Sequence, residues 1–192
     1  TVEKTGNIYM VGETSYYYPC AIYCRQRFQQ GDFGDVVYVE GEYFHDYSHG
    51  MIPVLQWRHG ADWERYANWP PMFYPTHSMS MVVSVTGAYA THVTGLGFED
   101  TDPDRLFHGR DQVYNNHFSN ETALCRMSDG SIARINEFRR IGHPGNVGMS
   151  MYGTLGSYEE HRGSHMWETK DKDARIDLTE QFQCEGVHAE GN

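Results

Sequence analysis

The sequence predicts an α+β domain built on an open, mixed but largely antiparallel β-sheet with helices packed on one face. In the second half of the chain, short strand patterns follow one another with tight turns between them, as in antiparallel sheets. In the first half, strand patterns alternate with two helical patterns that could cover one face of such a sheet. With 192 residues, the chain is long enough for one domain with a sizeable core.

The composition argues against several classes of protein. An aromatic content of 14% is too high for a disordered chain. No run of about 18 apolar residues is present, so we expect no membrane partner. The formal net charge of −11, with no cluster of Lys and Arg, argues against nucleic acid. The four cysteines are sparse, and we expect them to pack as free thiols in a cytoplasmic protein.

The first 45 residues are predicted to form two strands with a helix between them. Residues 7–11 are an apolar run that ends at Gly12 and is typical of a buried strand. Residues 19–30 carry apolar side chains at helical spacing and stop before Gly31, which fits a C-cap. Residues 36–45 alternate with a period of two, which predicts a strand.

The middle of the chain is predicted to be a long loop followed by a second helix. Residues 47–73 are irregular and rich in Trp, Pro and charge, and loops of that length are usually functional. Either Thr76 or Ser78 could cap the helix that follows, and Gly87 would end it.

Several short strands are predicted next, at residues 91–96, 113–118, 122–127, 132–138 and 147–152. Asp129-Gly130 is a strong hairpin signal between two of them. The glycine-rich residues 153–157 are interpreted as a turn and not a phosphate loop, because they follow the last predicted strand and precede Tyr158-Glu159-Glu160. No Gly-x-Gly-x-x-Gly is present after a strand. Residues 161–192 are polar and are expected to form a C-terminal tail that wraps the surface.

Two polar segments follow predicted strands. Glu13 comes just after residues 7–11, at a place where open α/β sheets bind ligands, although a solvated turn carboxylate is an equal alternative. Tyr43 and His45 share a face of the strand 36–45 and could donate hydrogen bonds or transfer protons. His45, Asp46 and His49 are metal ligands by type, but their spacing offers no further pair on a fixed element.

His77 lies at the entrance of the second predicted helix. Pro75 favours an extended conformation of Tyr74 and places Thr76 and His77 at the helix start. The positive end of the helix dipole favours a neutral imidazole, which can take a proton from a hydroxyl group. The alternative is a histidine that merely caps the helix.

A series of motifs appears in a characteristic order: GE at 12–13, GDFGDVV at 31–37, EGEYFHD at 40–46, YPTH at 74–77, SDGS at 128–131 and YGTLGS at 152–157. In this order they resemble the C-terminal half of the Gfo/Idh/MocA oxidoreductases, the family of glucose–fructose oxidoreductase, inositol dehydrogenase and rhizopine-catabolism proteins. The resemblance covers about residues 1–160.

This resemblance implies a division of the chain. Residues 1–12 would be the end of a Rossmann domain that lies upstream and holds NAD or NADP. Residues 13–160 would be an α+β substrate-binding and dimerisation domain, and residues 161–192 a tail. The open sheet would build the substrate pocket and an interface for a homodimer or a larger oligomer. We expect this chain to be inactive alone, because its dinucleotide-binding domain is missing.

The resemblance also suggests roles for individual residues. Many dehydrogenases of the family carry Asp-x-x-x-His in this domain, and His77 fits the histidine although Phe73 replaces the aspartate. His77 is the expected base, with Tyr43 as its catalytic partner. The remaining expected contacts to a sugar or polyol substrate are Glu13, His45, Trp57, Arg58 and Tyr74, with the Trp57–Arg58 region forming a stacking wall.

Three alternatives remain open at this point. The YPTH string resembles the NAD-dependent α-N-acetylgalactosaminidase branch, whose substrate residues map onto Glu13, Tyr43, Tyr74 and His77. That branch usually continues Gly-Leu-Gly-Pro, whereas this chain reads Ser-Met-Ser-Met. The chain could also be a non-catalytic carbohydrate-binding or dimerisation module. A metal at His45, Asp46, His49 and His77 is the weakest hypothesis, and we expect none.

Overall fold

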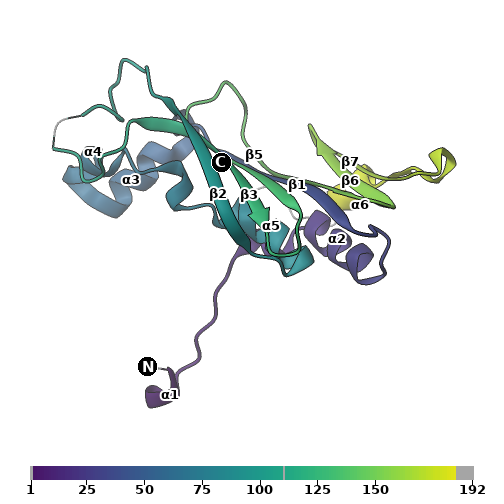
Figure 1. The fold of residues 1–192 in the computed structure, drawn as a ribbon. Coiled ribbons are helices and arrows are strands. Elements are labelled where there is room, and N and C mark those ends of the chain that lie inside the picture. Colours follow the sequence, from purple (N-terminus) through teal and green to yellow (C-terminus); the bar gives the residue numbers. More distant parts are fainter. Residues whose placement is uncertain (1, 110, 185–192) are drawn as a thin grey trace.

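An eight-stranded sheet forms the framework of the computed structural model, which describes residues 2–109 and 111–184 (Figure 1). The strand order is β2-β3-β4-β1-β5-β6-β7-β8. The central strand β1 (Val36–Phe44) runs parallel to β4 (Ile132–Phe138) and antiparallel to β5 (Asn146–Gly153). Every other neighbouring pair is antiparallel, so the predicted open, mixed and largely antiparallel sheet is confirmed.

The strands on one side of β1 follow the predicted pattern closely. β2 (Ala90–Glu99) pairs with β3 (Phe118–Met127), and β3 forms a hairpin with β4 at Asp129-Gly130. Gly130 adopts a φ of 91°, a conformation that glycine reaches without strain. The predicted strand at 113–118 is wrong, because only Phe118 lies in a strand and the residues before it are irregular.

The sheet continues into the segment that we expected to be a surface tail. β6 (Gly156–His161), β7 (Ser164–Thr169) and β8 (Ile176–Asp177) extend it, and α6 (Thr179–Cys184) follows a short helix, η5 (Lys172–Ala174). Trp167 and Phe182 are buried in the main core. A strand with one large inward side chain among polar residues has too little apolar alternation to be recognised. Residues 185–192 lie outside the described residues.

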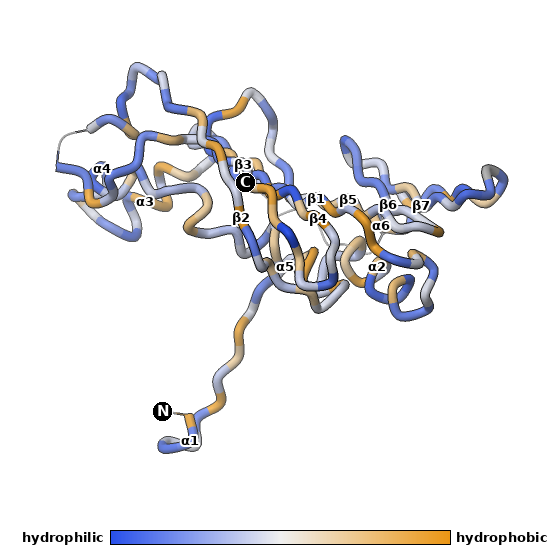
Figure 2. Tube along the Cα trace, viewed as in Figure 1, coloured by the Kyte–Doolittle hydropathy of each residue, from blue (hydrophilic) through white to orange (hydrophobic). Residues whose placement is uncertain are grey.

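The N-terminal segment does not form the predicted buried strand. After α1 (Val2–Thr5), residues 7–11 extend away from the sheet (Figure 1). They form no strand pairing with the described residues. Figure 2 shows apolar positions along them. Ile8 is 97% exposed and Met10 is 84% exposed. An apolar run becomes a buried strand only when a neighbouring strand covers it, and this part of the structure supplies none.

Two helices cover one face of the sheet, as predicted (Figure 1). α2 (Pro19–Gln29) begins at a proline, and α5 (Thr76–Thr86) ends at Gly87, whose φ is 72°. Pro75 occupies the N-cap position of α5, so Thr76 and Ser78 lie inside the helix and neither caps it. The largest fully buried residues of this main core include Phe33, Val39, Met81, Ile135 and Met151.

Residues 47–73 form a chain of short helices, in contrast to the predicted irregular loop. They are η2 (Tyr47–Met51), α3 (Ile52–His59), η3 (Gly60–Asp62), α4 (Trp63–Tyr66) and η4 (Pro71–Phe73). Helices this short have too few turns to show a helical period. Residues of η2, α3 and α4 pack on a second, smaller core of Tyr47, Leu55, Ala67, Leu106 and Phe107, whereas Met72 of η4 packs against the main core. No helix in the described part of the chain is long and apolar enough to cross a membrane.

Candidate functional site

A cavity of about 370 Å³ lies beside the second core, and Tyr47 and Leu55 of that core line it. One wall, which we call the sheet wall, comes from β1, the start of α5 and the segment at 12–14; the other, the α3 wall, comes from α3 and η2. Six predicted site residues line the cavity: Glu13, Tyr43, His45, Arg58, Tyr74 and His77. A cavity of this size suits a small ligand such as a monosaccharide.

Trp57 is the predicted site residue that the structure places elsewhere. It is 82% exposed and does not line the cavity. Trp57 and Arg58 are consecutive residues of α3, so their side chains leave the helix about 100° apart and only one faces the cavity. Trp69 provides the aromatic surface instead, with its ring 5.7 Å from that of Tyr74.

His77 on the first turn of α5 is paired with Glu13. The imidazole Nδ1 lies 2.7 Å from Glu13 Oε1, although the two residues are 64 positions apart, and 3.2 Å from Ser15 Oγ. Burial acts to raise the pKa of the Glu13 carboxyl, but hydrogen bonds from Ser15 and His77 outweigh it and hold the pKa below its ordinary value. An ionised Glu13 accepts the Nδ1 proton, which leaves Nε2 as the nitrogen that can accept another.

Tyr43 and His45 form the second polar pair of the sheet wall. The Tyr43 hydroxyl lies 2.6 Å from His45 Nδ1, and His45 Nε2 lies 2.8 Å from the carbonyl oxygen of His49. A carbonyl only accepts, so Nε2 carries the proton and Nδ1 accepts from the phenol. The Tyr43 ring is 5.1 Å from the His77 ring in an edge-to-face arrangement. The phenol and the imidazole of His77 therefore face the same small volume.

A buried ion pair, which the sequence did not reveal, connects Tyr43 of β1 with the start of α5. Arg139 Nη2 donates to Glu137 Oε2 at 2.8 Å, and the Arg139 guanidinium lies 4.6 Å from the centre of the Tyr43 ring. Ser78, next to His77, donates to the other oxygen of Glu137. Burial raises the pKa of Glu137 to about 7, although Arg139 and Ser78 act to lower it. The inward alternation Ala133, Ile135, Glu137 was the available signal for this residue.

Gly41 allows the start of α5 to approach β1 this closely. A Cβ atom at this position would lie 2.4 Å from the carbonyl oxygen of Ser78, a distance that no real contact reaches. The EGEYFHD segment therefore contributes a close backbone approach as well as the side chains of Tyr43 and His45.

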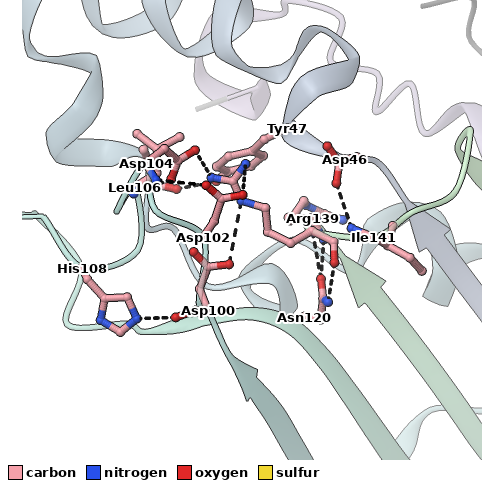
Figure 3. A network of polar contacts seen from close by, with 12 residues as sticks. Asp46, Tyr47, Asp100, Asp102, Asp104, Leu106, His108, Asn120, Arg139 and Ile141 are labelled. Carbon is pink, nitrogen blue, oxygen red and sulfur yellow. Dashed lines mark hydrogen bonds and ion pairs between the residues drawn. The ribbon is translucent and has the colours of Figure 1, made fainter.

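The arrangement gives the metal hypothesis no support. The Asp46 carboxylate accepts from Ser48. It also accepts from the backbone N–H of Ile141 (Figure 3). Burial acts to raise its pKa, but these hydrogen bonds hold it below the ordinary value. Within residues 2–109 and 111–184, no three His, Cys, Asp or Glu side chains gather as a metal site would require. Cys20, Cys24 and Cys125 are free and buried, as expected of packing cysteines.

Comparison with known proteins connects this fold to oxidoreductases. No protein-family model matches the chain, and no curated protein matches it closely enough to count as a relative. Solved structures do match, and they are oxidoreductases of the kind that the sequence motifs resemble.

Three of these structures illustrate the likeness. An oxidoreductase from Sinorhizobium meliloti is 17% identical with a TM-score of 0.61, over 92% of this chain and 44% of that one. An inositol dehydrogenase homolog from Azotobacter vinelandii, solved with NADH and myo-inositol, is 10% identical with a TM-score of 0.66 over the same shares. UDP-N-acetylglucosamine 3-dehydrogenase from Acidithiobacillus ferrooxidans is 14% identical with a TM-score of 0.60, over 92% and 48%. At such identities the likeness establishes the fold, and this chain spans less than half the length of these structures.

Proposed function

We propose that this chain is the substrate-binding domain of an NAD(P)-dependent oxidoreductase that acts on a sugar or polyol. The observation that carries the proposal is the His77–Glu13 pair, which lies beside Tyr43 on one wall of a monosaccharide-sized cavity. The neighbours support the substrate class, since one was solved with myo-inositol and NADH and another is a dehydrogenase of a sugar nucleotide.

The chain's own residues can manage the proton of such a reaction. When a carbinol is oxidised, its hydroxyl proton needs an acceptor within hydrogen-bond reach. His77 lines the cavity, and because its Nδ1 is bonded to Glu13, its Nε2 is the nitrogen that would take this proton. The Glu13 carboxylate then stabilises the imidazolium, much as the carboxylate of a catalytic triad does. Tyr43 and Tyr74 can hold other hydroxyl groups of the substrate.

The hydride would leave with a cofactor that this chain does not hold by itself. A bound nicotinamide supplies the hydride acceptor. The sequence has no glycine-rich phosphate loop, so a further domain would bind most of the dinucleotide, and the chain alone would be inactive. The choice between NAD and NADP belongs to that domain.

Substitution of His77 tests the proposal in the full-length protein that joins this chain to its dinucleotide-binding domain. We expect His77→Ala to reduce kcat by roughly 10²- to 10⁴-fold, the usual contribution of a general base, with little change in cofactor affinity. The exposed His92 provides the matched control, and His92→Ala should leave kcat unchanged. An unchanged kcat in His77→Ala would contradict the assignment of the base, and the absence of any turnover in the wild-type full-length protein would favour a non-catalytic module.

We also propose that the sheet face opposite the helices is a homodimer interface. Leu124 and Ile132 on that face are 52% and 46% exposed, and Tyr38 and Tyr152 pack beside each other there. Apolar side chains on a broad, uncovered sheet mark an interaction surface. Light scattering at micromolar concentration should show dimers or larger oligomers, and a monomer would count against this interface.

A further inference from the structure

Arg58 is a cation in the cavity wall, and it forms no ion pair with the part of the chain that the structure describes. Its side chain extends from the last turn of α3 into the lining of the cavity. Among residues 2–109 and 111–184, no carboxylate or carbonyl group accepts a hydrogen bond or ion pair from it. The other cavity arginine, Arg139, is different, because Glu137 and the carbonyl oxygens of Tyr43 and Phe138 occupy its guanidinium.

The acidic groups of the cavity do not compensate this charge. Glu13 is the one carboxylate in the lining, and its oxygen Oε1 already accepts from Ser15 and His77. The negative charge of the lining therefore belongs to the sheet wall, and the charge at the α3 wall is positive, even though the whole chain carries a formal charge of −11. An unpaired guanidinium at a binding site selects planar anions, which it can hold with two parallel hydrogen bonds.

Arg58 and the proton-accepting pair lie on different walls of the cavity. The proton-accepting pair of His77 and Glu13 belongs to the sheet wall, whereas Arg58 belongs to the α3 wall. A ligand that carries its anionic group at the α3 wall would present another part of its ring to His77. Val54 and Leu55 of the same helix offer apolar contacts beside the guanidinium.

We infer that the substrate of this site is an anionic sugar, whose carboxylate or phosphate group binds Arg58. The inference rests on the proposed function and narrows its substrate class. It predicts that an acid sugar or a sugar phosphate binds more tightly than its neutral parent sugar, since hydrogen bonds to charged groups are stronger than neutral ones.

Direct binding to the 192-residue chain tests the inference without turnover. Ligand-observed NMR titrations would compare D-glucuronate and D-glucose 6-phosphate with D-glucose, and D-galacturonate with D-galactose. We expect at least one anionic sugar to bind roughly tenfold more tightly than its neutral parent. The uronates and the phosphate distinguish the two sources of negative charge.

Two substitutions assign the preference to Arg58. Arg58→Gln should remove the preference for the anionic sugar over its neutral parent, and Arg58→Lys should retain part of it. Arg126→Gln is the matched control, because Arg126 is an exposed arginine on β3 that does not line the cavity, and its loss changes the net charge equally. Arg58 is exposed and has no hydrogen-bond or ion-pair partner among the described residues, so the variant should fold, which circular dichroism would verify.

The outcomes separate failure of the inference from failure of the proposed function. Equal binding of charged and neutral sugars, or a preference that persists in Arg58→Gln, would overturn the inference and leave the sugar site intact. An Arg58→Gln variant that loses affinity for NAD(P) rather than for sugars would also overturn it. If no sugar of either kind binds, the proposed function fails together with the inference.

Discussion

The two walls of the cavity differ in what holds them. The sheet wall rests on the main core, where β1, β4 and β5 bury Val39, Ile135 and Met151 beneath α2 and α5. The α3 wall rests on the second core, which consists of five buried residues: Tyr47, Leu55, Ala67, Leu106 and Phe107. Its connecting segments are held largely by polar contacts, such as those from the Asn68 amide to the carbonyl groups of Tyr114 and Asn116.

The residues proposed to transfer protons and the residue proposed to recognise the ligand lie on walls that differ in this way. The groups that would move protons, His77, Glu13 and Tyr43, belong to the wall with the larger core and with regular strand pairing. The cation that would recognise the ligand belongs to the wall with the smaller core. Regions with few buried apolar contacts open locally at lower free energy than the core of the sheet. We therefore expect the α3 wall to adjust around a ligand while the sheet wall stays fixed.

Truncation of one buried phenylalanine in each core should show most directly whether the two walls differ in stability. Phe33 and Phe107 are both fully buried, the first against Trp167 with ring centres 4.9 Å apart and the second against Tyr47 at 5.4 Å. Phe33→Ala should lower the free energy of global unfolding by about 3–5 kcal/mol, as buried phenylalanines usually do. Phe107→Ala should mainly destabilise the α3 wall.

Urea unfolding combined with native-state hydrogen exchange distinguishes the two effects. Phe107→Ala should reduce the protection of amides in α3 and leave the amides of β1 and β5 protected. Phe107→Leu keeps most of the volume and serves as the control for the cavity. Equal loss of protection in both regions would show that the two cores unfold as one unit.

A pH dependence should be the next largest effect, and it arises in the main core. Burial raises the pKa values of Glu137 and Glu160 to about 7, against an ordinary 4.5 for glutamate. Between these values the unfolded chain loses protons that the folded chain retains, so the free energy of unfolding falls as the pH rises from about 4.5 to 7. Below pH 4.5 this loss of stability is absent. Above pH 7 each carboxyl lowers the free energy of unfolding by about 3 kcal/mol.

Substitution of each carboxyl in turn shows how much it contributes to the decline of the free energy of unfolding with pH. Urea unfolding at pH 5, 6, 7 and 8 should show a smaller decline in Glu137→Gln and in Glu160→Gln than in the wild type. Burial lowers the pKa of His165, which acts in the opposite sense, so the difference between wild type and variant is the quantity to compare. The lowered pKa values of Glu13 and Asp46 affect stability only at more acidic pH. Identical slopes in all three proteins would contradict the prediction.

The sequence predicted the sheet wall better than the α3 wall, for a physical reason. Period-two alternation identified β1 and β4, and glycine signals placed the ends of α2 and α5. The helices at 52–59 and 63–66 are too short for a helical period, and β7 buries too few apolar residues to stand out. Local patterns record local structure, so elements stabilised by distant partners escape them.

The features of the candidate site also differ in how well the sequence predicted them. Resemblance to a family identified His77, Tyr43 and Glu13 as individual residues of one site, and the cavity brings them together. The pairing of Glu13 with His77 joins residues 64 positions apart, and no local signal could reveal it. Phe73 stands four residues before His77, and the carboxylate that contacts this histidine comes from another segment, at Glu13. Arg139 was missed because a charged residue at a strand end usually faces solvent.

The smallest expected effect concerns the ionic contact that holds the α3 wall in place. Arg140 pairs with Asp104 and lies 3.8 Å from Asp100 and 4.0 Å from Asp102, acidic residues that Figure 3 shows gathered near Tyr47. Its guanidinium also lies 5.1 Å from the centre of the Tyr47 ring, which belongs to the second core. Loss of this cation leaves three neighbouring carboxylates, one of them almost fully buried.

Arg140→Gln should therefore loosen the segment at 100–108 by about 1 kcal/mol, the upper range for partly exposed ion pairs. Hydrogen exchange at 105–107 should accelerate about fivefold, and added salt should reduce the difference from the wild type, since salt screens the repulsion among the carboxylates. Arg175→Gln removes an exposed pair with Glu168 and should change neither quantity. Acceleration that spreads into β1 would show that the α3 wall and the sheet wall are coupled, and the separation of recognition from chemistry would then fail.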